Sequence, residues 1–354
     1  MAKKKEEKNE RTKKFDDAIK NINKKYGENT VIRLGDATSV EVDVITTGAL
    51  SLDLALGIGG IPKGRITEIY GPESSGKSTL CLTVAKYCQQ NGGNVAYIDA
   101  ENSIDIEYAA NIGVNVNDLL LSQPDDAEQA FDVVGELVES AAADLIIIDS
   151  LAALVPRKEL EGDFGDQHVA LQARLVSQAL RKLTTLVNKT KTAIIFINQL
   201  RSKIGVYGNP EDTPGGRALK YYASLRIDIR RREYIKKGDN VLGNAVRAKI
   251  AKNKLAVPFK EAMFEIIFGR GIKKVSAIFE AAINNNVITK EGNTYSYGEV
   301  KLGVGKNNAL STIKSDKKLT EKIEVETRKR YEENKNNFDE VKIEEDEEEM
   351  EELQ

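Results

Sequence analysis

The stretch GPESSGKST, residues 71–79, has the residue types and spacing of a loop that binds nucleotide phosphates. A strand-like run, RITEIY, precedes it and a helix-like run follows it, as the pattern G-x-x-x-x-G-K-[ST] requires. Its glycines allow a tight turn that points backbone N–H groups at phosphate oxygens near the positive end of a helix. Lys77 would reach the β- and γ-phosphates, and Ser78 would ligate Mg²⁺. The predicted phosphate loop comprises Gly71, Pro72, Glu73, Ser74, Ser75, Gly76, Lys77, Ser78 and Thr79.

Acidic residues at the ends of two further strand-like runs could turn nucleotide binding into hydrolysis. Asp149 ends the apolar part of LIIIDS, where a carboxylate at the carboxyl end of a parallel strand would hold hydrated magnesium; capping the next helix is the alternative. The run NVAYIDAEN contains Asp99 and Glu101, which share one face of a strand. Glu101 lies further out and is the better general base for a water aligned on the γ-phosphate, whereas surface capping by either acid is the alternative.

A fourth strand-like run leads into an unusual connection. IIFINQLR contains Asn198 and Gln199, whose neutral side chains can donate to a phosphate oxygen. Directly after them, residues 200–219 hold four glycines and two prolines and have no helical or strand period. A connection of this length inside a compact domain is usually functional or disordered. A change in the contact between Gln199 and the γ-phosphate would therefore act directly on the start of this loop.

The charges around this connection indicate a phosphodiester backbone as its ligand, because basic residues bracket it and its glycines allow close backbone approach. A second polar loop, residues 156–168, precedes a helix-like run whose Arg174, Ser177 and Arg181 share one face at spacing i, i+3 and i+7. A solvated basic face is the alternative for that helix. The residues predicted to contact such a backbone are Arg174, Ser177, Arg181, Arg201, Lys203, Gly215, Gly216 and Arg217, with Lys220 close by.

The elements that must position these residues alternate between strand and helix from about residue 40 to about residue 270. Such alternation favours an α/β fold, a mostly parallel sheet flanked by helices, and the later apolar runs follow one another as an antiparallel extension would. We expect a helical segment over residues 1–38 that packs on the main domain or on another subunit, and an ATPase core with DNA-binding loops over 39–272. A small α/β C-terminal domain over 273–331 and a disordered acidic tail over 332–354 would follow.

Composition excludes several classes of protein and of site. The chain of 354 residues has no apolar run near the roughly 20 residues that span a bilayer, and its charged first residues exclude a secretory signal, so we expect a cytoplasmic protein with no membrane partner. His168 is the only histidine, which is too few for a His-rich metal site or a Ser/His/Asp triad. Cys81 and Cys88 are expected to be free, buried thiols, although a disulfide or metal site is the alternative. Residues 339–352 hold ten acids and one lysine, a block that is usually disordered but could compete with an anionic ligand.

Several strings occur in the order and at the spacing of the bacterial RecA recombinase family, which the chain resembles from about residue 13 to about residue 330. They are SLDLALGIGGIPKGRITEIYGPESSGKSTL, YIDAEN, DSLAALVP, FINQLRSKIGV, GGRALKYYAS and KNKLAVPFK. The resemblance implies a RecA-like core, ATP and Mg²⁺ as cofactors, and a DNA-dependent ATPase that forms a helical filament on single-stranded DNA. Such a recombinase pairs the strand with homologous duplex DNA and exchanges strands in DNA repair, and it stimulates self-cleavage of a repressor in the SOS response.

The resemblance also implies roles for individual residues. Glu101 would be the catalytic base, Gln199 the γ-phosphate sensor, and Asp105 and Tyr108 neighbours of the adenine. Lys252 and Lys254 would reach the ATP held by an adjacent subunit. Lys301 and Lys306 fall where such proteins admit duplex DNA, with lysines on a solvated hairpin as the alternative.

Four positions depart from the family pattern. Ser78 replaces the more usual threonine and keeps the hydroxyl, Arg217 stands where Asn is common, Tyr221 replaces Phe in the subunit contact, and Phe268 replaces a Tyr near the nucleotide. These departures bear on affinity and on filament cooperativity.

Two rival functions remain. One is a non-catalytic, ATP-gated DNA-binding scaffold, which the complete set of hydrolytic residues disfavours. The other is a hexameric helicase-type motor, which the lack of a large N-terminal domain disfavours.

Overall fold

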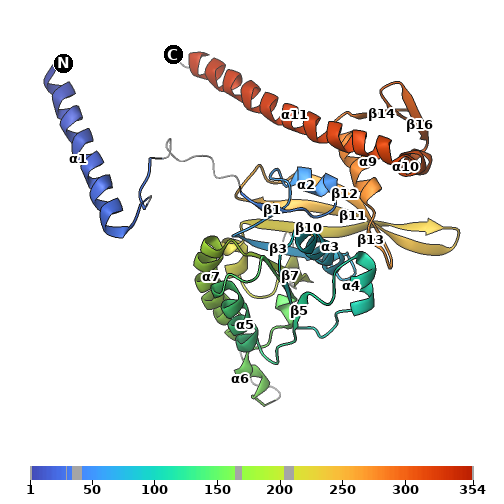
Figure 1. Ribbon diagram of the computed structural model, residues 1–354, viewed down its shortest axis with the longest axis horizontal. Coiled ribbons are helices and arrows are strands. Elements are labelled where there is room, and N and C mark those ends of the chain that lie inside the picture. Colours follow the sequence, from blue (N-terminus) through green and yellow to red (C-terminus); the bar gives the residue numbers. More distant parts are fainter. Residues whose placement is uncertain (1, 29, 34–41, 164–169, 203–210, 353–354) are drawn as a thin grey trace. The chain divides into compact units, whose positions relative to one another are not determined.

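The protein divides into two compact units, Met1–Val42 and Asp43–Gln354, which are described separately. The computed structural model describes residues 2–28, 30–33, 42–163, 170–202 and 211–352, without the side chains of 2–9, 202 and 336–352 (Figure 1). The predictions for His168 and Lys203 therefore lie outside the described residues.

The N-terminal unit is built on helix α1, Ala2–Tyr26. Past its end the chain folds back: the Asn23 amide bonds both backbone groups of Val31, at 2.9 and 2.8 Å. Arg33 and Asp16 form an ion pair at 2.5 Å. Phe15 and Tyr26 keep 61% and 65% of their surface exposed, so within this unit α1 has apolar surface left for a partner.

The second unit is organised around a sheet that has nine strands in the described residues, in the order β13-β12-β11-β10-β3-β7-β6-β4-β5 (Figure 1). The pairs from β10 to β5 are parallel, and those from β10 to β13 are antiparallel. The strands are β3 Ile66–Gly71, β4 Val95–Asp99, β5 Leu119–Ser122, β6 Leu145–Asp149, β7 Ala193–Gln199, β10 Leu225–Lys237, β11 Asn240–Asn253, β12 Glu261–Ile267 and β13 Gly271–Ile272.

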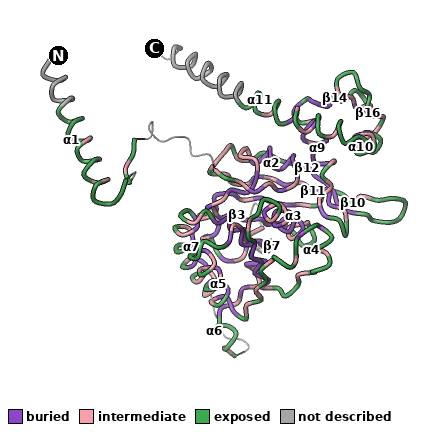
Figure 2. The backbone as a smooth tube through the Cα atoms, viewed as in Figure 1, coloured by how far each residue is buried: buried purple, intermediate pink, exposed green. Residues whose placement is uncertain are grey.

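Helices cover both faces of this sheet, which explains why its central strands are continuous apolar runs. Alternate residues of β6 face opposite ways: Leu145 and Ile147 join the core under α3, Lys77–Gln90, and α4, Ile106–Ile112. Ile146 and Ile148 join the core under α5, Ala127–Glu139, and α7, Leu171–Thr190, where the short α8, Ala218–Tyr222, also packs. Figure 2 shows β3 and β7 buried between these layers. Parallel strands held this way bring their carboxyl ends to one edge.

The C-terminal part of this unit has its own core, formed by α9, α10, the three-stranded sheet and α11. Ion pairs tie it to the main sheet: Glu265 of β12 bonds Lys273 at 2.8 Å and Lys306 at 3.0 Å, and Lys306 also bonds Glu280 at 2.8 Å. The elements are α9 Lys274–Asn284, β14 Ile288–Glu291, β15 Thr294–Tyr297, β16 Val300–Val304, α10 Lys306–Ser315 and α11 Lys317–Glu352.

The remaining elements are short. They are β1 Val44–Ile45, α2 Leu50–Ala55, β2 Ile61–Pro62, η2 Leu151–Ala153, α6 Arg157–Leu160, β8 Arg201–Ser202 and β9 Glu211–Asp212.

The α/β fold, its parallel core and its antiparallel extension confirm the sequence prediction. Strand β5 at the sheet edge was not predicted, and α11 continues through the acidic run to Glu352. The four domain boundaries stay predictions.

Cys81 and Cys88 are free and buried, as expected. Among the helices that the structure describes, none combines the length and apolar character needed to cross a bilayer.

Candidate nucleotide site and DNA-facing loops

The phosphate loop joins the end of β3 to the first turn of α3, and two of its glycines are required by their surroundings. A Cβ on Gly71 would lie 2.0 Å from the carbonyl oxygen of Ile229. Gly76 flanks α3 with a φ of +97°, a conformation that residues with a Cβ rarely adopt. The turn therefore brings backbone N–H groups to the N-terminus of α3, where the helix dipole favours an anion.

Lys77 folds its side chain back over this loop. Its ammonium donates to the carbonyl oxygens of Gly71 at 3.2 Å and Pro72 at 2.8 Å. Burial lowers the pKa of Lys77, and the charges of Asp149 and Glu101 oppose that shift. The ammonium thus lies between the loop backbone and the acidic side of the site.

Ser78 and Asp149, the two predicted magnesium ligands, lie within hydrogen-bond distance of each other. The Ser78 hydroxyl donates to Asp149 Oδ2 at 2.8 Å, and the Tyr97 hydroxyl donates to the same oxygen at 2.6 Å. Burial raises the pKa of Asp149, the two hydrogen bonds lower it, and the charges of Glu101 and Asp99 raise it again, leaving it above its ordinary value. Tyr97 was missed by the sequence analysis, although it lies two residues before Asp99 on the same strand. A buried carboxylate among other acids is a place where a cation would be stabilised.

Glu101 connects the ends of three strands. Its Oε1 accepts from Gln199 Nε2 at 2.9 Å and from the Ser150 hydroxyl, so residues at or just past the carboxyl ends of β4, β6 and β7 converge there. Ser150 is a second residue that the sequence analysis missed, and its position directly after Asp149 was the available signal. Asp99 instead is buried and accepts the backbone N–H groups of Ser103 and Ile104, both at 3.1 Å. Of the two acids, only Glu101 presents an exposed carboxylate.

Asp105 and Tyr108 lie beside the phosphate loop. Asp105 precedes α4 and accepts the backbone N–H of Tyr108 at 2.9 Å, as an N-cap. The Tyr108 hydroxyl lies 2.8 Å from Thr79 Oγ1 in the loop. The structure thus brings the two residues to the edge of the nucleotide site.

The described ends of the glycine-rich connection are held together. Arg201 pairs with Asp212 and Ser202 with Glu211, which makes β8 and β9 the two arms of a loop. A Cβ on Gly215 would lie 2.7 Å from Leu151, and one on Gly216 would lie 2.9 Å from Cβ of Ala173 on α7. We call residues 200–217, the segment that the sequence predicts to contact DNA, the DNA loop; its residues 203–210 lie outside the described residues.

The predicted basic face of α7 is present. Arg174, Ser177 and Arg181 line one surface hollow, and the two arginines are exposed. Arg217, also exposed, precedes α8. Gly216 contacts Ala173, which lines the same hollow, so the returning arm of the DNA loop reaches this face.

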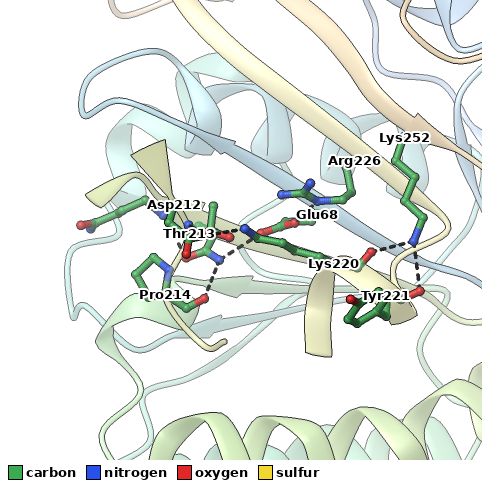
Figure 3. Close-up of polar contacts among 10 residues, drawn as sticks. Glu68, Asp212, Thr213, Pro214, Lys220, Tyr221, Arg226 and Lys252 are labelled. Atoms are coloured by element: carbon green, nitrogen blue, oxygen red, sulfur yellow. Dashed lines mark hydrogen bonds and ion pairs between the residues drawn. The ribbon is translucent and has the colours of Figure 1, made fainter. Parts of the chain in front are cut away.

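Lys252 and Lys254 do not reach the phosphate loop of their own subunit. Lys252 donates to the carbonyl oxygens of Lys220 at 2.6 Å and Tyr221 at 3.0 Å (Figure 3). Lys254 donates to the carbonyl oxygen of Tyr221 at 3.1 Å. Both therefore cap the C-terminus of α8. Burial lowers the pKa of Lys252 to about 8, with help from Lys254 and Arg226.

The remaining predicted residues lie apart from this site. Tyr221 is 67% exposed and Phe268 50%, so both are available to another subunit. Lys301 is exposed on β16, whereas Lys306 is held by Glu265 and Glu280. Asn198 is wholly buried and bonds Glu68 and Pro214, so its expected availability to a phosphate oxygen is wrong for this structure.

Comparison with known proteins decides the family. The RecA N-terminal domain family matches residues 13–273, and the RecA C-terminal domain family matches residues 276–332. The chain belongs to the RecA family. Protein RecA of Thermus thermophilus is 54% identical over 320 residues, 90% of this chain and 94% of that protein. Protein RecA of Clostridium perfringens is 52% identical over 315 residues, 89% of this chain and 90% of that protein.

A solved structure, that of the RadB recombinase, supports the fold. It has a TM-score of 0.50 and 24% identity and covers 65% of this chain and 98% of its own. Membership of the RecA family makes this chain an ATP-dependent DNA recombinase and a DNA-dependent ATPase, as predicted, and does not favour the non-catalytic scaffold.

Proposed function

We propose that this RecA-family recombinase couples ATP hydrolysis to its affinity for DNA through the Glu101–Gln199 contact. Glu101 would accept a proton from the attacking water as general base, and Lys77 would stabilise charge on the transferred phosphoryl group. Gln199 ends β7 and directly precedes the DNA loop, so exchanging its bond to Glu101 for a bond to a γ-phosphate oxygen would move the loop's outgoing arm. The 2.9 Å bond between Gln199 and Glu101 carries this proposal.

Mg²⁺ fits the acidic side of the site. Ser78 offers a hydroxyl and Asp149 a buried carboxylate, which suits an ion that keeps several waters and takes its other oxygens from phosphates. When bound there, Mg²⁺ would neutralise charge on the phosphates. Residues 71–79 with Asp105 and Tyr108 would hold the rest of ATP.

Single-stranded DNA would be held by the basic hollow of α7 and the DNA loop. Arg174 and Arg181 would pair with backbone phosphates, and the exposed Gly216 would let the strand approach the loop backbone. Gly215 is buried and faces Leu151, which does not support its predicted contact with DNA. Duplex DNA would meet the C-terminal domain at Lys301, which is exposed, while Lys306 would first have to leave its carboxylates. Stimulation of repressor self-cleavage in the SOS response is proposed from family resemblance.

The test of this function is ATP hydrolysis measured with and without single-stranded DNA at fixed ionic strength. We expect DNA to stimulate the wild type, and Gln199→Ala to bind ATP but to lose at least about fivefold of that stimulation, because the coupling between two sites is typically worth about 1–3 kcal/mol. A matched control is Gln90→Ala, which removes an exposed amide at the C-terminal end of α3, the end opposite the phosphate loop, and outside the basic hollow of α7. A wild-type rate that ignores DNA would refute the coupling.

Lys252 gives a prediction about pH. Contact with the ATP of an adjacent subunit requires its ammonium form, and its pKa of about 8 means that raising the pH removes this charge. We expect the protein concentration for half-maximal ATP-dependent assembly to rise about tenfold between about pH 7 and pH 9, because a group is about 90% deprotonated at one pH unit above its pKa. Sedimentation at fixed Mg²⁺ and salt measures this, and Lys252→Arg should flatten the profile because Arg stays charged. An equal fall in the Arg variant would contradict the assignment.

A further inference from the structure

Beneath the base of the DNA loop lies a buried polar cluster that the functions above do not use (Figure 3). Glu68 on β3 accepts from Asn198 on β7 at 3.0 Å and from Arg226 on β10 at 2.5 Å. Asn198 also donates to the carbonyl oxygen of Pro214, at 3.2 Å, in the returning arm of the loop. We call Glu68, Asn198, Arg226 and the Pro214 carbonyl the anchor cluster.

The anchor cluster is buried and internally satisfied. Glu68 and Asn198 have no exposed surface, and the Arg226 side chain is 14% exposed. The guanidinium carbon of Arg226 lies 4.6 Å from the ring centre of Tyr70. A buried charge whose partner is removed is strongly destabilising, because the lost hydration is not replaced. The geometry of this cluster is therefore held firmly.

Asn198 also contacts the sensor directly. While its Nδ2 bonds Glu68 and the Pro214 carbonyl, its Oδ1 accepts the backbone N–H of Gln199 at 3.0 Å. One side chain thus holds both Gln199, which directly precedes the DNA loop, and Pro214 in its returning arm. The nearby arm is fixed further: Lys220 of α8 pairs with Asp212, and Glu211 bonds Arg230 through both carboxylate oxygens.

We propose that Asn198 is a positioning residue that makes Gln199 and the returning arm of the DNA loop move as one body. Since this rests on the proposed role of Gln199, a change at the sensor would then reach both arms of the loop rather than the outgoing arm alone. Glu68 and Arg226 would set the orientation of the Asn198 amide, with Nδ2 toward Pro214 and Oδ1 toward Gln199.

The experiment measures affinity for single-stranded DNA with ADP and with a non-hydrolysable ATP analogue, in the wild type and in Asn198→Ala. We expect the alanine variant to bind the analogue without DNA within about twofold of the wild type. The ratio of its two DNA affinities should fall at least about fivefold toward one, since allosteric coupling typically spans about 5–150-fold. By reciprocity, the gain in analogue affinity caused by DNA should fall by the same factor. Asn285→Ala is the matched control, because Asn285 is a buried amide on the distant C-terminal domain with one bond to Ala281.

If Asn198→Ala does not fold, Asn198→Ser replaces it in the experiment. The serine hydroxyl is too short to bond both Gln199 and Pro214, so this variant also breaks the link. A variant whose DNA affinity falls equally with both nucleotides, leaving the ratio intact, would overturn the inference, since Asn198 would then be merely structural. A wild type that shows no difference between the two nucleotides would overturn the proposed function itself, and with it the role of Asn198.

Discussion

Replacing Glu101 with glutamine is expected to slow DNA-dependent ATP hydrolysis by about 10²–10⁴-fold, the usual contribution of a positioned general base. Glutamine is close in shape and keeps an oxygen that can accept from Gln199 Nε2, but it cannot take a proton from water. ATP binding and assembly on DNA should therefore stay within about twofold of wild type, because no group that contacts the phosphate loop is lost. Single-turnover hydrolysis together with equilibrium binding of an ATP analogue separates the two effects.

The control for this experiment is Glu139→Gln, which removes a carboxylate from the exposed end of α5. It should hydrolyse ATP at the wild-type rate. Normal turnover by Glu101→Gln would show that another group is the base. A loss of ATP binding in that variant would show instead that Glu101 acts in binding.

Replacing Ser78 with alanine is expected to weaken Mg²⁺ binding to the ATP-bound protein by at least about 10–100-fold, the range seen even when only a residue supporting a metal ligand is lost. The variant removes the proposed metal ligand and also the hydroxyl that donates to Asp149 at 2.8 Å. Titration of Mg²⁺ against a fluorescent ATP analogue measures this without relying on turnover.

Ser78→Thr is the matched variant, because it keeps the hydroxyl and adds only a methyl group. It should bind Mg²⁺ like the wild type. Equal Mg²⁺ affinity in the alanine and threonine variants would remove Ser78 from the metal site.

The convergence of the proposed catalytic side chains was predictable because parallel strands share one carboxyl edge. Asp149, Glu101 and Gln199 each follow an apolar run, and that pattern alone places them near the phosphate loop. The orientation of Asn198 was not predictable, because a polar residue at a strand end looks the same in sequence whether it faces solvent or the core. Its partner Glu68 is 130 residues away in the chain, and only the order of the strands brings them together.

Other features were missed for the same kind of reason. Strand β5 is four residues long and lies at the sheet edge with Leu120 and Leu121 half exposed, so its residues show neither alternation nor full burial. The contacts of Lys252 and Lys254 with α8 join segments more than 30 residues apart, and no local pattern signals them.

The contacts of Lys252 and Lys254 affect which nucleotide favours the assembly of subunits. A free subunit already satisfies Lys252 and Lys254 with three carbonyl bonds at the end of α8. Under the proposed assignment, joining a neighbour replaces these bonds with bonds to phosphate. The net gain in binding free energy is therefore the difference between hydrogen bonds to a charged acceptor and hydrogen bonds to a neutral one. A nucleotide that has lost its γ-phosphate offers fewer charged oxygens to the two lysines, so the exchange of bonds gains less free energy. Assembly would thus discriminate ATP from ADP by competition within the subunit, without a separate proofreading step.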